Sequence, residues 1–188
     1  MRKLNYEEIS AFRVPRDEIG LVEKLPIWGM LDNIRSLYNV GSIFRTSDGA
    51  RVSGLMLCGF TPHPPRKEID KTALGSTATV PWLHFRDPLE GVAEAKRSGA
   101  RICVLEHTTA SVPYYTITPD MFPLCLVVGN ELTGVSPQLV AAADMAIDIP
   151  MFGVKQSLNA AVAYGIAVFE LVRIWRESSS ARSHRGPA

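Results

Sequence analysis

The stretch AIDIPMFGVKQSLNAAVAYGIAVFELVRIW, residues 146–175, joins a short apolar run, a polar loop and a long helical segment. Pro150 ends the apolar run, which has the length of a strand. From residue 157 onward, apolar and small side chains surround the helix on nearly every side, which predicts a helix in the core or at a subunit interface. A strand followed by such a helix is typical of α/β folds.

Other apolar runs of strand length occur earlier in the chain, with helical spacing between them. They are continuous rather than alternating, which indicates strands buried on both faces, as in a parallel sheet. The pattern predicts an α/β fold with a mostly parallel sheet and helices on both faces. The predicted strands are 28–31, 55–59, 80–85, 102–105, 124–128 and 146–149, and the predicted helices are 40–50, 87–100, 137–143 and 157–176.

The same pattern divides the chain into three parts. Residues 1–25 have mixed charge and are expected to form a peripheral extension, and residues 26–176 form one domain. Residues 177–188 have no apolar anchors and are expected to be a disordered tail. A Pro- and charge-rich stretch at 61–77 is predicted to be a long functional or mobile loop.

Composition is that of an ordinary globular chain. Apolar residues make up 46%, and the net charge of +1 gives no global indication of nucleic-acid binding, although a local basic patch could serve. The three cysteines lie in apolar runs and are predicted to be buried thiols, which indicates a reducing, cytoplasmic location. We expect no signal peptide and no membrane span, because the sequence has no apolar run of the required length.

Common fingerprints of nucleotide and nucleophile sites are absent. The sequence has no G-x-G-x-x-G after a strand, no G-x-x-x-x-G-K-[ST] and no G-x-S-x-G. Cys103 and His107 are four residues apart but lack further partners at metal-binding spacing, so no metal site is predicted. Three polar stretches remain as candidate sites.

The first polar stretch is DNIRSLYNVGSIFRTSDGA, residues 32–50. Asn39 lies at the predicted start of a helix, where it either caps the helix or belongs to a site. Arg45 is either a solvated helix residue or a phosphate contact, because the planar guanidinium binds phosphate oxygens bidentately.

The second polar stretch is LCLVVGNELTGVS, residues 124–136, where a buried strand leads into a turn. In open α/β sheets, ligands bind beyond the carboxyl ends of strands. Gly129 and Gly134 would let a ligand approach the backbone closely. An ordinary strand–turn–helix loop would also explain the glycines, but it leaves Glu131 unexplained.

The third polar stretch is the loop that precedes the last helix. Ser157 is the predicted N-cap of that helix. Capping accounts for one side chain only, which leaves Lys155, Gln156 and Asn159 as candidates to bind something other than protein.

Together, the three stretches resemble the motifs of the SpoU/TrmH family of the SPOUT superfamily, which are S-adenosylmethionine-dependent RNA ribose 2′-O-methyltransferases. The similarity covers about residues 33–175 and places a methyltransferase domain at 26–176. The matching stretches are NVGSIFRT at 39–46, VGNELTGVS at 128–136 and IPMFGVKQSLN at 149–159.

The resemblance implies a C-terminal deep trefoil knot within the α/β fold, and a homodimer packed through the helices of the knot region. It also implies a bent S-adenosylmethionine held in the knot, largely by backbone groups. By motif, the cofactor-binding residues are Gly129, Ile149, Met151, Ser157 and Leu158. By position alone, Leu105, Glu106 and His107 form a further wall.

The resemblance further implies the catalytic residues Asn39, Arg45, Glu131, Ser157 and Asn159. We expect Arg45 to clamp a neighbouring phosphate and stabilise developing negative charge rather than act as a base, because its pKa lies above about 12. Asn39 and Asn159 would fix this geometry, Glu131 would orient Arg45 or Asn159, and Ser157 would cap the helix beside the cofactor.

The partner implied is an RNA, either tRNA or rRNA. Two alternatives stay open: a knotted dimer that binds RNA or cofactor without catalysis, and a related enzyme that methylates a base rather than a ribose.

Overall fold

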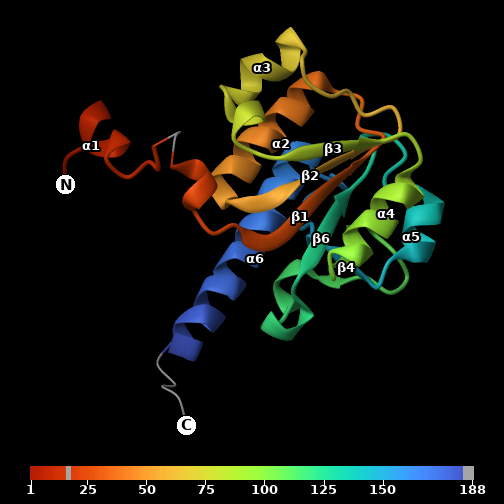
Figure 1. Cartoon of the computed structure of the whole chain (residues 1–188). Helices are drawn as coiled ribbons and strands as arrows, with labels where there is room; N and C mark the ends of the chain where they lie inside the picture. Colours follow the sequence, from red (N-terminus) through yellow and green to blue (C-terminus); the bar gives the residue numbers. More distant parts are fainter. Residues whose placement is uncertain (16–17, 184–188) are drawn as a thin grey trace.

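The computed structural model describes residues 1–15 and 18–183, with 181–183 described by their backbone alone. Within these residues, seven strands form one sheet in the order β3-β2-β1-β6-β4-β7-β5 (Figure 1). Every strand pair is parallel, which confirms the predicted parallel sheet. The strands are β1 (Leu25–Asp32), β2 (Val52–Cys58), β3 (Trp82–Phe85), β4 (Arg101–Leu105), β5 (Val112–Pro113), β6 (Leu124–Val128) and β7 (Met145–Asp148).

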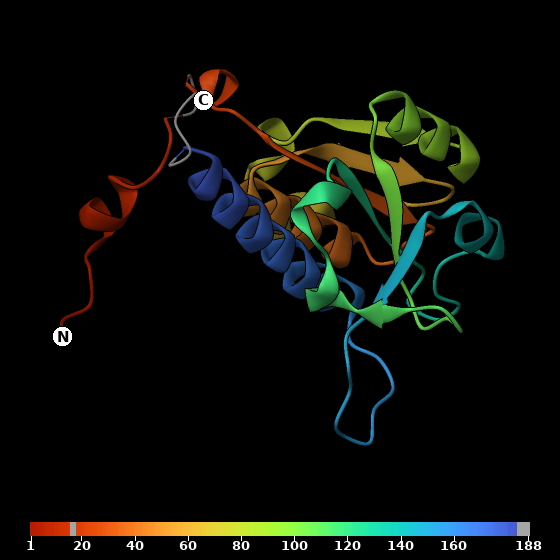
Figure 2. The ribbon, with the colours of Figure 1, turned by 90° about the horizontal axis from the view of Figure 1, so that it is seen from below.

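Helices cover both faces of this sheet (Figures 1 and 2). On one face lie α2 (Leu37–Ala50), α3 (Lys67–Ala73) and α6 (Ala160–Ser183), and on the other lie α4 (Pro88–Arg97) and α5 (Pro137–Ala142). The buried side chains accordingly form two clusters, one on each side of the strands. In the central strand β6, Leu126 belongs to the first cluster and Val127 to the second, which is why the strand sequence is apolar throughout.

The helix α6 is divided lengthwise between core and surface. Tyr164, Val168 and Leu171 are buried on the sheet side, and the hydroxyl of Tyr164 lies 2.7 Å from the Ser47 hydroxyl of α2. The opposite side carries apolar residues that stay exposed, among them Phe169 at 51%. The sequence predicted that this helix lies in the core or at a subunit interface. In the single chain, only the side that faces the sheet belongs to the core.

The stretch 61–77 contains a helix, α3, so the expectation of a long loop is wrong. Ile69 and Ala73 are four residues apart on the same side of the helix, and both side chains are buried. The helix packs closely on α2, because a Cβ at Gly41 would lie 2.2 Å from the Ile69 carbonyl oxygen. The Thr72 hydroxyl also donates to the Tyr38 carbonyl of α2 at 3.0 Å.

The predicted start and end of the last helix also need correction. α6 begins at Ala160 rather than at residue 157, and it runs to Ser183, so residues 177–183 are helical rather than a disordered tail. An ion pair between Arg173 and Glu177 at 2.6 Å supports this part of the helix without any apolar anchor. The rest of the predicted tail, 184–188, lies outside the described residues.

The described residues before the sheet form two short helices. α1 (Tyr6–Ser10) begins with a capping box between Asn5 and Glu8 and lies away from the body of the molecule (Figure 1). A 3₁₀ turn at Ile19–Leu21 follows. No helix in the described part of the chain has the length and apolar character that a membrane crossing requires.

The three cysteines are free thiols buried in the strands, as predicted. Burial raises the pKa of Cys58 and of Cys103 to about 12, so neither thiol ionises near neutral pH.

Candidate active site

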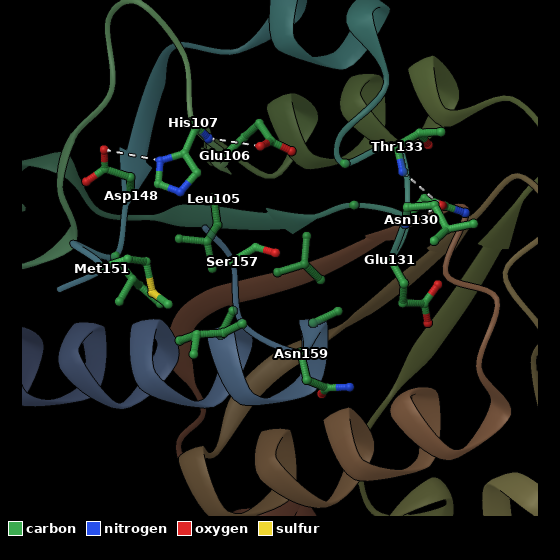
Figure 3. Close-up of a pocket in the computed structure, with 18 residues that line it drawn as sticks. Leu105, Glu106, His107, Asn130, Glu131, Thr133, Asp148, Met151, Ser157 and Asn159 are labelled. Carbon is green, nitrogen blue, oxygen red and sulfur yellow. Dashed lines mark hydrogen bonds and ion pairs between the residues drawn. The ribbon is translucent and has the colours of Figure 1, made fainter. Parts of the chain in front are cut away.

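A cavity of about 380 Å³ opens where β4, β6 and β7 end at the carboxyl edge of the sheet (Figure 3). Four segments line it: those following β4, β6 and β7, and the start of α6. The volume is within the range of small-molecule sites, which is about 300–1,000 Å³. In Figure 3, His107, Asp148 and Met151 lie at one end, and Asn130, Glu131 and Thr133 lie at the other.

The structure brings all eight predicted cofactor-binding residues to this cavity. They are Leu105, Glu106, His107, Gly129, Ile149, Met151, Ser157 and Leu158. Of the predicted catalytic residues, Glu131, Ser157 and Asn159 line the cavity, whereas Asn39 and Arg45 do not.

Glu131, Asn39 and Asn159 form a hydrogen-bonded line beside the cavity. The Asn39 Nδ2 donates to Glu131 Oε1 at 2.8 Å, and the Asn159 Nδ2 donates to Asn39 Oδ1 at 3.1 Å. Glu131 Oε2 and Oε1 also accept the backbone amides of Arg35 and Ser36 at 2.9 and 3.0 Å. The carboxylate therefore fixes the first turn of α2 and, through Asn39, the first residue before α6.

This arrangement changes the role expected of Glu131. Glu131 reaches Asn159 only through Asn39, and the Arg45 side chain forms no hydrogen bond or ion pair with the described residues. Three donors from α2 and its N-terminal end occupy the Glu131 carboxylate, so it is a poor proton acceptor. The geometry makes Glu131 a positioning residue.

Asn159, not Ser157, caps α6. The Asn159 Oδ1 accepts the amides of Ala161 and Val162 at 3.0 and 3.3 Å, which is the N-cap arrangement. The prediction that Ser157 caps the helix is therefore wrong, and Ser157 is an exposed residue of the cavity wall. Similarly, Ser36 caps α2 through the Asn39 amide at 3.3 Å, so Asn39 lies inside the helix with its side chain free for Glu131.

Arg45 lies exposed on α2, outside the cavity. Arg45 is six positions after Asn39, which corresponds to about 240° around the helix, so the two side chains leave α2 on different faces. Thr46, its neighbour, faces Gly165 of α6. The guanidinium is thus free to meet a phosphate from solvent.

The glycines of the turn after β6 are required by the protein's own close packing. A Cβ at Gly129 would lie 2.1 Å from the Val135 amide nitrogen, and one at Gly134 would lie 2.1 Å from Glu106 Oε2. That same Oε2 accepts the Val135 amide at 2.9 Å, and Glu106 Oε1 accepts the His107 amide. These glycines let the turn close against Glu106, and both also line the cavity. The expectation that they admit a ligand to the backbone stays a prediction.

His107 connects the cavity to the loop after β7. Its Nδ1 lies 3.6 Å from Asp148 Oδ2, and its Nε2 lies 3.1 Å from the Gln156 carbonyl, to which it donates. This loop projects from the body of the molecule (Figure 2), and Phe152 and Val154 at its tip are 97% and 98% exposed. His107 therefore holds the base of the loop against the cavity.

Residues 27–169 match the model of the SpoU rRNA Methylase family. The chain belongs to this family. It is 36% identical over 143 residues to the tRNA (guanosine(18)-2'-O)-methyltransferase of Aquifex aeolicus (strain VF5), a match that covers 76% of this chain and 66% of that relative. The chain spans just under two thirds of the length of that relative and 57% of a putative TrmH family tRNA/rRNA methyltransferase from Staphylococcus haemolyticus.

Solved structures show the same fold. The A. aeolicus TrmH/SpoU tRNA modifying enzyme superposes with a TM-score of 0.76 at 32% identity, over 87% of this chain and 82% of that one. An AdoMet-bound rRNA methyltransferase from Sinorhizobium meliloti gives 0.75 at 29% identity, over 90% and 70%.

Two residues of this SpoU family site were not among the predicted site residues. Asn130 holds the turn, because its Oδ1 accepts the Leu132 amide at 2.9 Å and its Nδ2 donates to the Asn33 carbonyl at 2.7 Å. Asp148 orients His107. An Asn followed closely by a glycine is a signal for a side-chain-stabilised turn, and could have identified Asn130; Asp148 gives no such signal.

The SpoU family carboxylate Glu131 predicts a pH dependence of stability. Burial of the carboxyl opposes ionisation, but donors from Arg35, Ser36 and Asn39 outweigh it and hold the pKa of Glu131 below its ordinary value of 4.5. A lowered pKa contributes stability that is present above pH 4.5 and lost as the pH falls through the folded value. We therefore expect Glu131→Gln to lower the thermal midpoint at pH 7, and the difference from wild type to shrink in acid.

Thermal unfolding monitored by circular dichroism between neutral and acid pH measures this. Glu90→Gln, at an exposed carboxyl of α4 without a hydrogen bond among the described residues, is the control for the substitution itself and should leave the thermal midpoint at pH 7 near that of wild type. A Glu131→Gln difference that stays constant with pH would contradict the assignment.

Proposed function

We propose that the chain is an S-adenosylmethionine-dependent RNA methyltransferase that methylates a ribose 2′-hydroxyl in a tRNA or an rRNA. The main support is the chain of hydrogen bonds from Glu131 through Asn39 to Asn159. It ends at a cavity lined by all eight predicted cofactor-binding residues. Membership of the SpoU family and the likeness to a relative named as a tRNA 2'-O-methyltransferase support it.

The cavity lining suits S-adenosylmethionine, which supplies an electrophilic methyl group when bound. Apolar walls from Leu105, Val128 and Leu158 suit the adenine ring, and the turn 129–134 offers polar groups for charged parts of the molecule. The neighbour from S. meliloti is described as AdoMet bound.

The residues of this chain act mainly by positioning. Asn39 and Asn159 each use one Nδ2 hydrogen in the bonds to Glu131 and Asn39. The second Nδ2 hydrogen of each can be donated to the ribose. Glu131 holds Asn39 in place. Because three donors hold the carboxylate of Glu131 and its pKa is lowered, it is a poor base, and the proton of the 2′-hydroxyl leaves to solvent or to a phosphate. Arg45 clamps that phosphate from outside the cavity.

The same proposal includes a C-terminal deep trefoil knot and a homodimer, with 26–176 as the methyltransferase domain. Family membership supports the knot, and the exposed apolar residues Val162, Ile166 and Phe169 of α6 support the dimer. Pulling both ends of the chain in an optical trap tests the knot, because a tightened knot shortens the extended chain. Analytical ultracentrifugation tests the dimer, and a monomer at micromolar concentration would contradict it.

The central test incubates the purified chain with labelled S-adenosylmethionine and separate pools of bulk tRNA and rRNA. Nuclease digestion and nucleoside mass spectrometry should reveal a 2′-O-methylnucleoside, and Asn159→Ala should abolish most of it, because this change removes both the α6 cap and the bond to Asn39. Cofactor binding without methyl incorporation would instead indicate a binding protein, and a methylated base would indicate base methylation. Wild-type turnover in Asn159→Ala would contradict the site.

A further inference from the structure

A group of exposed aromatic and basic side chains lies on β3 and in the segments that follow β2 and β3, at one edge of the sheet. Phe60 is 62% exposed, and the other four members are also exposed. We call these residues the edge patch: Phe60, His63, Arg66, His84 and Arg86.

The rings of the edge patch are held in place. The His63 ring stacks on Trp82 of β3, with centroids 5.6 Å apart and an interplanar angle of 22°, and lies 4.7 Å from the His84 ring. His84 Nε2 donates to the Gly59 carbonyl at 3.3 Å, next to Phe60. The loop after β2 is therefore fixed on the edge strand with its aromatic rings at the surface.

Hydrogen bonds of Asn33 connect the edge patch to the turn after β6. The Phe60 amide donates to Asn33 Oδ1 at 3.1 Å, and the Asn33 carbonyl accepts Asn130 Nδ2 at 2.7 Å. Asn130 is directly followed by Glu131. A single residue thus separates the loop that carries Phe60 from the turn that lines the cavity.

The two arginines of the edge patch have no ion-pair partner among the described residues. Arg66 and Arg86 form no ion pair within the described residues, whereas Lys96, Arg97 and Arg173 elsewhere on the surface each have a carboxylate partner. Asp87, which follows Arg86, accepts the Leu89 amide at 2.9 Å instead.

We propose that the edge patch binds the RNA strand adjoining the target nucleotide. An unstacked base lies on Phe60, and two backbone phosphates pair with Arg66 and Arg86. Exposed rings among unpaired cations are the chemistry that single-stranded RNA requires, whereas the core of a protein interface is depleted of charge. This inference rests on the proposed function, because it takes the RNA substrate as partner.

The test measures binding of a fluorescein-labelled oligouridylate of about 12 nucleotides, within the site size of single-strand binders, by fluorescence anisotropy. Phe60→Ala should weaken binding about fivefold or more at every salt concentration, because it removes one stacking contact. The double variant Arg66→Ala/Arg86→Ala should reduce the slope of log affinity against log salt by about 1.4, since each phosphate contact on a single strand contributes about 0.7.

Two controls lie away from the edge patch. Tyr115→Ala removes a 55% exposed ring beyond β5, at the opposite edge of the sheet, and Arg101→Ala removes a cation at the amino end of β4. Both should bind the oligouridylate like wild type. Wild-type affinity and slope in the patch variants, losses of equal size in the controls, or no binding by the wild-type protein would each overturn the proposal.

Calorimetric titration with S-adenosylmethionine and the methylation assay separate this inference from the proposed function. The patch variants should bind the cofactor and unfold like wild type, because the changed side chains are exposed and outside the cavity. Methyl transfer with unchanged oligouridylate binding in the variants would refute the edge patch alone. Patch-dependent RNA binding without methyl transfer would refute the proposed function and leave the edge patch standing.

Discussion

Replacing Arg45 with lysine is expected to slow RNA methylation about 10²-fold or more, and Arg45→Ala up to about 10³-fold, the range for loss of one donor to developing negative charge. A lysine ammonium offers a point charge where the guanidinium offers two parallel donors to a phosphate. The affinity for S-adenosylmethionine should not change, because Arg45 lies outside the cavity. Single-turnover methylation and calorimetry measure the two quantities separately.

Arg101→Lys is the matched control for this prediction, because Arg101 is also exposed but lies at the amino end of β4. It should methylate RNA at the wild-type rate. A wild-type rate in Arg45→Lys would show that the guanidinium fork has no role, and weaker cofactor binding in Arg45→Ala would contradict the position of Arg45 outside the cavity.

The second large effect concerns Gly129. In Gly129→Ala, the new Cβ would lie 2.1 Å from the Val135 amide nitrogen and 2.2 Å from the Gly134 carbonyl carbon. Both are backbone atoms, so the turn itself must move. We expect the free energy of unfolding to fall by about 1–3 kcal/mol, the usual cost of overpacking. The affinity for S-adenosylmethionine should fall at least about tenfold, which corresponds to a loss of about 1.4 kcal/mol of binding free energy when the turn moves.

Gly153→Ala provides the control within the same site region. A Cβ there would meet nothing within 4 Å, so stability and cofactor affinity should stay at wild-type values. Urea unfolding and calorimetric titration measure both variants. Normal cofactor binding in Gly129→Ala would show that the turn can move without cost and that the cavity does not depend on its closure.

Sequence patterns predicted well the strands that are buried on both faces of the sheet. β6 occupies 124–128, as predicted, because a strand buried on both sides needs an apolar residue at every position. α3 was missed because only Ile69 and Ala73 of its seven residues are buried, and two apolar positions do not establish a helical period. The helix depends on its close contact with Gly41, which no local pattern indicates.

The site residues show the same limit. Motif matching selected residues that line one cavity, except for Asn39 and Arg45, and it assigned Glu131 to Arg45 or Asn159 rather than to Asn39. The contact between Glu131 and Asn39 joins positions 92 residues apart, so it follows from the packing of β6 beside β1 and not from spacing along the chain. Ser157 and Asn159 are equally good caps by residue type. The structure distinguishes them, because α6 begins at Ala160 and the Asn159 Oδ1 accepts the Ala161 and Val162 amides.

The order in which the four segments that line the cavity are translated has a consequence for folding during synthesis. The segments after β4, β6 and β7 emerge first, and the wall at the start of α6 is translated after every strand of the sheet. Until then Ser47 lacks its Tyr164 partner, and only α2 and α3 cover that face of the sheet. An unfinished chain therefore has neither a complete core nor a complete cavity, and a nascent polypeptide cannot sequester the cofactor before its own synthesis has passed α6.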